Sequence, residues 1–94
     1  MPYNPSYEMW RSWGEAMRRR RHSKGMTQKQ LSEKTGIPIQ TIGLHEYKHY
    51  ALNILFCYAV AEALDWTIDD WRKEALKIMK DGTWDRKLHL RCRK

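Results

Sequence analysis

The segment of residues 25–46 constrains the fold more than any other part of this 94-residue chain. Thr27 can cap a helix through its hydroxyl group, and Gln30 can return a second hydrogen bond to that cap from three residues on. Gly36 is suited to end this helix, because glycine adopts a left-handed backbone at little cost. Pro38 is suited to the first turn of a second helix, where its missing N–H would have no partner in any case. The segment therefore predicts two short helices joined by a tight turn.

Apolar residues inside the segment are predicted to fix the angle between these two helices. We expect the helices near residues 27–34 and 38–46. Leu31 begins the buried face of the first helix, Ile42 faces inward on the second, and Ile37 lies in the turn between them. Two short helices held at one angle in this way form a helix-turn-helix.

Three further helices are predicted from apolar periodicity and capping residues. They are expected from a Ser6 cap to about His22, from an Asn53 cap to about Ala63, and from a Thr67 cap to about Gly82. The first is expected to bury residues spaced three and four apart, Tyr7, Trp10, Trp13 and Met17. The last begins with a second capping box, Thr67 with Asp70, and is expected to bury Ile68, Trp71, Ala75 and either Ile78 or Met79.

Residues 13–71 resemble the Cro and lambda-repressor type (Xre-type) helix-turn-helix DNA-binding family. The residues that carry the resemblance are Gly25, Thr27, Gln28, Leu31, Gly36, Ile37, Thr41, Ile42, Glu46, Val60, Ala61, Ala63, Leu64 and Ile68. The resemblance implies an all-α fold, a compact five-helix lambda-repressor-like DNA-binding domain over residues 1–82 with its helix-turn-helix at 27–46. The first helix is longer than is usual in the family, and a short basic C-terminal tail follows at residues 83–94.

The resemblance implies a sequence-specific transcriptional regulator of the phage or mobile-element type, which binds double-stranded DNA and acts by occlusion or recruitment at a promoter. In this family the recognition helix, here residues 38–46, lies in the major groove. The positions implied to read bases are Ile39, Gln40, Thr41, Gly43 and Leu44. Gln40 can pair with adenine through its amide, and Ile39 and Leu44 offer methyl groups to thymine. We therefore expect an A/T-containing half-site.

Phosphate contacts are implied beside the recognition helix. Gln28 matches the phosphate-binding glutamine of the family, at the start of a helix whose free N–H groups favour an anion. The full set of implied phosphate contacts is Thr27, Gln28, Lys29, Tyr47, Lys48 and His49. Each phosphate that is neutralised adds about one unit to the negative slope of log affinity against log salt concentration.

The charge of the chain favours a polyanionic partner. The formal net charge is +7; residues 11–49 carry nine Lys or Arg against three acidic residues, and the last nine residues carry five against none. In the run of four arginines at residues 18–21, successive side chains point about 100° apart on a helix and cannot share one surface. The resemblance implies that Arg21 pairs with Glu46. Arg18, Arg19 and Arg20 are expected to act as solvated charge or through long-range attraction, without specific contacts.

Residues 45–49 also fit the H-E-x-x-H pattern of zinc metalloproteases, with His45 and His49 as metal ligands and Glu46 as the base. This alternative requires an uninterrupted helix through both histidines, a third ligand and a substrate cleft, for which a chain of this size has little room. Pairing with Arg21 would also occupy Glu46. We therefore expect His45 to be a buried aromatic filler, and we expect no enzyme activity, no metal and no cofactor.

A third possibility is a protein-interaction module built on the same fold. The recognition helix has few of the side chains that most often read DNA, and the chain has five Trp and five Tyr, which are common at protein interfaces. The simpler explanation is a homodimer that binds two-fold related half-sites. Its contact could form on the fourth and fifth helices together with Trp66, Trp71 and Trp84, but for Trp10, Trp13 and Trp71 we favour an ordinary core position.

Size and composition bear on the class of protein. The chain is expected to form one small domain, and its two cysteines cannot build a disulfide framework, which is typical of a cytoplasmic protein. Cys57 is expected to be a buried reduced thiol. We find no apolar stretch of about 18 residues and no signal peptide, so no membrane association is expected. No site for a small-molecule ligand is evident.

The C-terminal tail contains an alternation of polar and apolar residues, Lys-Leu-His-Leu-Arg-Cys-Arg, at residues 87–93. Such a pattern fits a short strand, yet the sequence predicts no partner strand elsewhere, and a mobile tail fits equally. The sequence therefore leaves the structure of the tail open.

Overall fold

The computed structural model describes residues 7–47 and 53–82, and the fold within them is all-α. Its helices are α1 (Tyr7–Ser23), α2 (Gln28–Thr35), α3 (Ile39–Tyr47), α4 (Ile54–Ala63) and α5 (Ile68–Asp81). Every predicted helix is present, and its bounds differ from the prediction by one residue at most. The expected Ser6 cap and the tail lie outside the described residues. None of the helices in the described ranges combines the length and the apolar character needed to cross a membrane.

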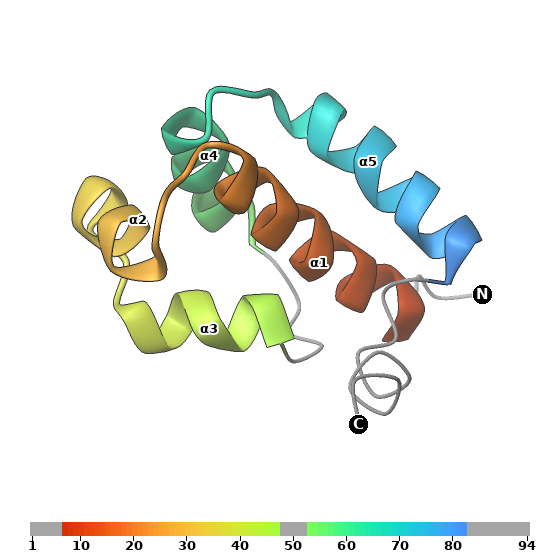
Figure 1. The fold of residues 1–94 in the computed structure, drawn as a ribbon, viewed down its shortest axis with the longest axis horizontal. Coiled ribbons are helices and arrows are strands. Elements are labelled where there is room, and N and C mark those ends of the chain that lie inside the picture. Colours follow the sequence, from red (N-terminus) through yellow and green to blue (C-terminus); the bar gives the residue numbers. More distant parts are fainter. Residues whose placement is uncertain (1–6, 48–52, 83–94) are drawn as a thin grey trace.

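Helix α1 lies at the centre of the arrangement (Figure 1). It packs along α5 on one side and along α3 on the other, while α2 packs on both α3 and α4. The core residues are Ala16, Met17, Leu31, Ile42, Phe56, Cys57, Val60, Ala61, Ala63, Leu64, Trp71, Ala75 and Ile78. Helix α3 contributes only Ile42 to this core, so most of its length lies at the surface of the molecule.

Side-chain caps begin three of the helices at the residues expected from the sequence. Thr27 Oγ1 accepts the backbone N–H of Gln30 at 3.0 Å, and the Gln30 side chain accepts the N–H of Thr27 at 2.8 Å. Thr67 and Asp70 form the same capping box at α5, and Asn53 accepts a backbone N–H at 2.8 Å at the start of α4. Each cap contributes about 1 kcal/mol, because it satisfies helix N–H groups that have no partner inside the helix.

The turn between α2 and α3 has the glycine geometry expected of it. Gly36 has a φ of 78°, and its N–H donates to the Ser32 carbonyl oxygen at 2.8 Å. Pro38 differs from the prediction by one position, because it precedes α3 and does not lie in its first turn. Its carbonyl oxygen accepts the N–H groups of Thr41 and Ile42 at 3.0 and 3.1 Å. The proline therefore starts the helix as an acceptor and needs no N–H of its own.

Gly14 permits a close approach between α1 and α3 that sequence analysis missed. A Cβ atom at this position would overlap the carbonyl oxygen of His45 on α3. The backbones of the two helices therefore pack directly on each other, which holds the C-terminal part of α3 against α1.

Of the tryptophans in the described residues, Trp71 lies in the core, Trp13 and Trp66 pack against the core partly buried, and Trp10 is only half-buried. Trp71 is fully buried, and its Nε1 donates to the Trp13 carbonyl oxygen at 2.9 Å. Its ring centroid lies 5.2 Å from that of Trp13 and 6.0 Å from that of Trp66. The core position favoured for Trp71 is therefore confirmed, and Trp71 is not available to a homodimer contact. Trp66 is partly buried, and Trp84 lies outside the described residues.

Candidate nucleic-acid interface

Helix α3 buries one face and presents the other to solvent. Ile42, His45 and Glu46 are buried, whereas the first and last residues of the helix keep 38% and 43% of their surface exposed. The outer face, as we call it below, consists of residues that recur along one side of the helix, Ile39, Gln40, Gly43, Leu44 and Tyr47. Four of the five predicted base-reading residues lie on this face, where Ile39 and Gln40 are exposed and Gly43 and Leu44 are half-buried. The fifth, Thr41, is half-buried beside it.

His45 holds the inner face of α3 against α4. Its ring stacks on Phe56 with the ring centroids 3.9 Å apart, and its Nδ1 lies 2.9 Å from the carbonyl oxygen of Thr41. The side chain is buried, as expected of an aromatic filler. One aromatic contact thus joins the predicted recognition helix to the first turn of α4.

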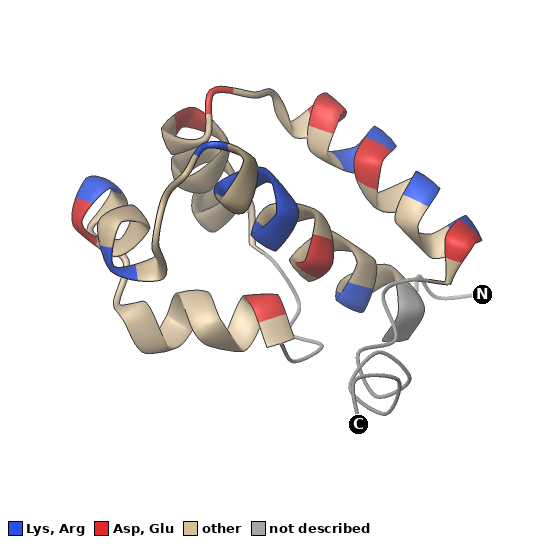
Figure 2. Cartoon of the chain, in the orientation of Figure 1, with Lys and Arg blue, Asp and Glu red and all other residues tan. Residues whose placement is uncertain are grey.

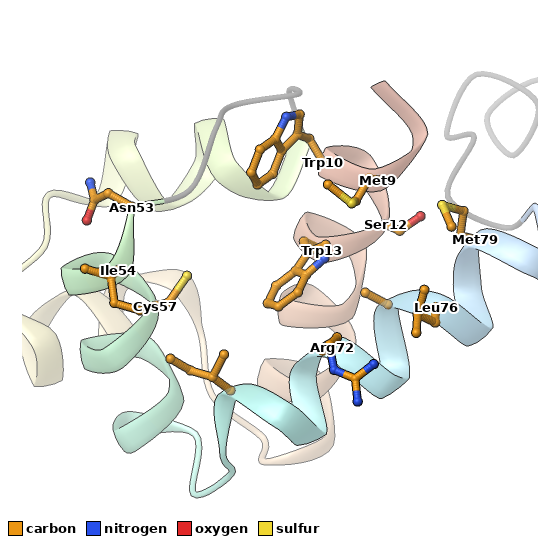
Figure 3. Close-up of a pocket in the computed structure, with 12 residues that line it drawn as sticks. Met9, Trp10, Ser12, Trp13, Asn53, Ile54, Cys57, Arg72, Leu76 and Met79 are labelled. Atoms are coloured by element: carbon orange, nitrogen blue, oxygen red, sulfur yellow. The ribbon is translucent and has the colours of Figure 1, made fainter. Parts of the chain in front are cut away.

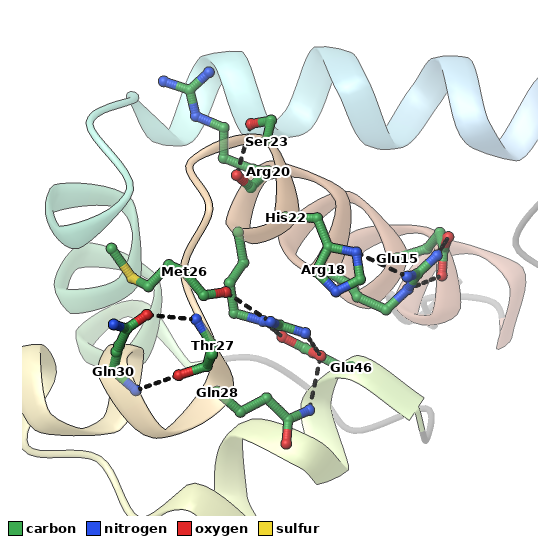
Figure 4. Close-up of polar contacts among 11 residues, drawn as sticks. Glu15, Arg18, Arg20, His22, Ser23, Met26, Thr27, Gln28, Gln30 and Glu46 are labelled. Carbon is green, nitrogen blue, oxygen red and sulfur yellow. Dashed lines mark hydrogen bonds and ion pairs between the residues drawn. The ribbon is translucent and has the colours of Figure 1, made fainter.

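Glu46 is the centre of a buried polar cluster at the end of α3 (Figure 4). Arg21 binds both carboxylate oxygens, from Nε at 2.8 Å and from a terminal nitrogen at 3.0 Å. Gln28 donates to the same carboxylate at 2.9 Å, and Arg11 donates to the Glu46 carbonyl oxygen at 3.1 Å. The structure therefore contains the pair that the family resemblance implied, and this one residue joins α1, α2 and α3.

Gln28 has a role that the sequence did not reveal. Its amide nitrogen is bound to Glu46, and its side-chain oxygen lies 4.0 Å from where a Cβ atom of Gly43 would stand. The first turn of α2 therefore lies beside the outer face of α3. The amide nitrogen carries a second N–H, which leaves it able to donate to a phosphate as well.

The other implied phosphate contacts lie at the two ends of this region. Thr27 uses its hydroxyl group as the cap of α2, and Lys29 is exposed in the first turn of that helix. Tyr47 is exposed at the end of α3. Lys48 and His49 lie outside the described residues.

The expectation that Arg18, Arg19 and Arg20 make no specific contacts is wrong. Arg18 and Arg19 bond the carboxylate of Glu15 at 3.1 and 3.0 Å, and Glu15 is itself buried. The hydrogen bond with Glu15 raises the pKa of Arg18. Spacings of three and four residues along one helix bring both arginines to the same carboxylate.

Arg20 caps the C-terminal end of α4 by binding its carbonyl groups. It donates to the carbonyl oxygens of Leu64 and Asp65 at 2.9 and 3.0 Å, and its guanidinium lies 5.2 Å from the centroid of the Trp66 ring. Carbonyl groups at a helix C-terminus have no partner in the helix and carry partial negative charge, so a guanidinium is favourable there. Leu64 lies 44 residues further along the chain, and no local pattern could predict this contact.

Many of the basic side chains of residues 11–49 bind groups within the protein and are not free to bind a partner. Arg11 and Arg21 are buried, and Arg20 is bound to the end of α4. Helix α3 itself carries no Lys or Arg (Figure 2). The count of basic residues in the sequence therefore overestimates the positive potential around α3.

The zinc alternative conflicts with these contacts. Glu46 is fully buried and bound by Arg21 and Gln28, so its carboxylate is not placed to activate a water molecule. His45 is stacked in the core. Among the residues that the structure describes, no group of three or more His, Cys, Asp or Glu side chains is placed to hold a metal ion, and His49 lies outside them.

Comparisons with known proteins agree with this geometry. The helix-turn-helix family matches residues 17–71, which is more than half of the chain. The crystal structure of the clp gene regulator ClgR from Corynebacterium glutamicum has a similar fold, with a TM-score of 0.75. Its sequence is 22% identical, and the likeness covers 93% of this chain and 90% of that one. No protein with a curated function matches the sequence.

Proposed function

We propose that this chain, because it belongs to the Cro and lambda-repressor type (Xre-type) helix-turn-helix DNA-binding family, regulates transcription by placing α3 in the major groove of a specific DNA duplex. The observation that carries the proposal is the two-faced arrangement of α3. Its inner face is anchored to α1, α2 and α4, while its outer face is open to solvent. An α-helix is about 10–12 Å across, and the major groove is about 12 Å wide.

The outer face suits a binding site that contains A·T base pairs. Gln40 is exposed in the first turn of α3, and its amide can form two hydrogen bonds with adenine. Ile39 and Leu44 offer methyl groups to the methyl group of thymine. Gly43 lets the helix backbone approach the bases, and Thr41 adds a hydroxyl group at the edge of the face.

Phosphate contacts on either side of α3 would set its position in the groove. Gln28 and Lys29 in the first turn of α2 lie on one side, and Tyr47 lies at the end of α3, with Lys48 and His49 following it directly. Gln28 also binds Glu46, so the group that would meet the phosphate is tied to the cluster that anchors α3. Such a link would keep the phosphate contact and the base contacts in one register.

A homodimer would read two such half-sites about one helical turn apart. Leu55 and Tyr58 on the outer side of α4 support a contact of this kind, because they expose 77% and 63% of their surface. A pair of such apolar side chains on a small domain is suited to an interface. Sedimentation that finds only monomer at tens of micromolar would contradict the dimer.

Selection of bound sequences from a random pool of DNA duplexes tests the proposed function. The native chain is expected to enrich one sequence, and Gln40→Ala is expected to lose about 1–3 kcal/mol of discrimination at one base position. Lys77→Ala is the matched control, because Lys77 is exposed on α5, and it should select the same sequence. Failure of the native chain to enrich any sequence would contradict the proposal. An unchanged preference in Gln40→Ala would remove only Gln40 from base reading.

A protein-interaction module is the second candidate. It is favoured by a recognition helix without Lys or Arg that exposes Ile39 and Tyr47. Salt distinguishes the two functions: affinity for a duplex falls steeply as salt rises, whereas an apolar protein interface is much less sensitive.

A further inference from the structure

A groove lies between α1, α4 and α5, and α3 contributes no residue to it (Figure 3). It has a volume of about 510 Å³. Its lining is largely apolar and includes Trp10, Trp13, Ile54, Cys57, Leu76 and Met79. An apolar groove of this kind is a candidate docking surface for an apolar segment.

We propose that residues 83–94 of this same chain bind in the groove, with the side chains of Trp84, Leu88 and Leu90 facing its floor. The DNA contacts proposed above use neither the groove nor this segment, although Trp84 is also one of the residues expected in a homodimer contact. The inference stands independently of DNA binding.

The alternation of the segment supports the proposal. Side chains of an extended chain face opposite sides in turn. One face of the segment would then consist of Trp84, Arg86, Leu88, Leu90 and Cys92, and the other of Asp85, Lys87, His89, Arg91 and Arg93. Arg86 departs from the apolar face, but its stem can lie along an apolar surface with its charge in water. The segment thus has one largely apolar face that needs cover and one fully polar face that suits solvent.

The segment follows α5 directly in sequence, at the end of the helix where Met79 lines the groove. Gly82 has a φ of 73°, and its N–H is bonded to the carbonyl oxygens of Ile78 and Met79, so the chain stops following the helix there. Met79 lines the groove only three residues earlier. Trp84 comes two residues after Gly82, within a reach of about 7 Å. Its side chain can therefore enter the groove at the Met79 end.

The lengths of groove and segment also agree. Along α5 the lining runs from Ile68 to Met79, which is about 16 Å at the rise of an α-helix. Trp84 to Leu90 spans about 20 Å when extended. A segment tethered at the rim has an effective concentration in the millimolar range, which favours it over a second copy of the chain at ordinary concentrations.

The reactivity of Cys57 tests the proposal, because this thiol lines the groove. Burial raises the pKa of Cys57 to about 11, so alkylation with iodoacetamide is followed at a mildly alkaline pH. The parent protein for this test is the full chain with the substitution Cys92→Ser, so that Cys57 is its one thiol. The apolar-face variant is Leu88→Ser with Leu90→Ser, and the matched control is Lys87→Ser with His89→Ser on the opposite face.

We expect the apolar-face variant to be alkylated on the order of tenfold faster than the parent, and the control to match the parent. The rate in the parent should not change with protein concentration, because the cover is intramolecular. Equal rates in all three proteins would overturn the proposal. A parent rate that rises on dilution would also overturn it, since a second copy would then be the cover. If circular dichroism shows that the double variant has lost helix, Leu88→Ser alone is judged by the same criteria.

Discussion

At the scale of single residues, one carboxylate fixes the predicted recognition helix. Glu46 is fully buried, and its side chain accepts hydrogen bonds from α1 and α2. Taking a charge out of water costs several kcal/mol, and this cost is offset only when the charge is well paired. Arg21 and Gln28 together provide that pairing. The cluster therefore orients α3 more than it adds net stability.

Glu46→Ala is expected to lower the free energy of unfolding by about 3–5 kcal/mol, because it leaves the guanidinium of Arg21 buried without its partner. Urea unfolding at low temperature measures the change. Lys77→Ala is the control, since it removes only an exposed pair with Glu74 at 3.9 Å and should cost about 0.5 kcal/mol or less. Arg21→Met combined with Glu46→Leu should recover much of the loss. Equal losses in Glu46→Ala and the control would contradict this account.

At the scale of the helices, packing against α1 decides how α3 is held. Two glycines, one facing the inner side of α3 and one on its outer face, show how the two sides of this helix differ. Gly14 faces the His45 carbonyl group with no room for a Cβ atom. Gly43 lies on the outer face, and the nearest atom to its missing Cβ is the Gln28 side-chain oxygen at 4.0 Å. The same residue type is therefore required by close packing at one position and is sterically replaceable at the other.

Gly14→Ala is expected to lower the stability of the fold by about 1–3 kcal/mol, because the added methyl group forces α1 and α3 apart. Gly43→Ala should instead raise it by about 0.5–1 kcal/mol, since alanine is the better helix former and has space there. Thermal unfolding followed by circular dichroism compares the two. A loss of stability in Gly43→Ala as large as that in Gly14→Ala would show that the described space is not present in solution.

At the scale of the whole molecule, the fold binds many of the basic side chains of residues 11–49 to groups within the protein. Arg20 neutralises the end of α4, Arg18 and Arg19 share Glu15, and Arg21 is buried with Glu46. Lys29 is exposed beside α3. The proposed DNA surface therefore depends on fewer cations than the net charge of +7 suggests.

The salt dependence of DNA binding tests which basic side chains remain available to phosphate groups. Lys29→Ala is expected to reduce the magnitude of the log-log salt slope by about one, because one phosphate contact is lost. Arg20→Ala should leave the slope unchanged while lowering stability, since its guanidinium already serves α4. Titrations of the selected duplex at several salt concentrations measure both slopes. A slope change in Arg20→Ala equal to that in Lys29→Ala would place Arg20 on the DNA.

Local features of this protein could be predicted from its sequence. Thr27, Asn53 and Thr67 mark helix starts, and Gly36 and Gly82 mark helix ends, because capping and left-handed turns involve residues no more than four apart. The inward position of Ile42 could also be predicted locally, whereas the outward positions of α3 were implied by the family resemblance. The family resemblance added the Arg21–Glu46 pair, which no local rule contains.

Tertiary structure alone decided the contacts between helices. The approach of Gly14 to His45, the hydrogen bond from Gln28 to Glu46 and the reach of Arg20 to Leu64 all join residues 18 to 44 positions apart. Their geometry depends on how far apart two helices pack, and that distance is set by every side chain between them. The groove between α1, α4 and α5 has the same origin: local patterns determine which residues form helices, but only the packed arrangement determines which space between the helices stays open.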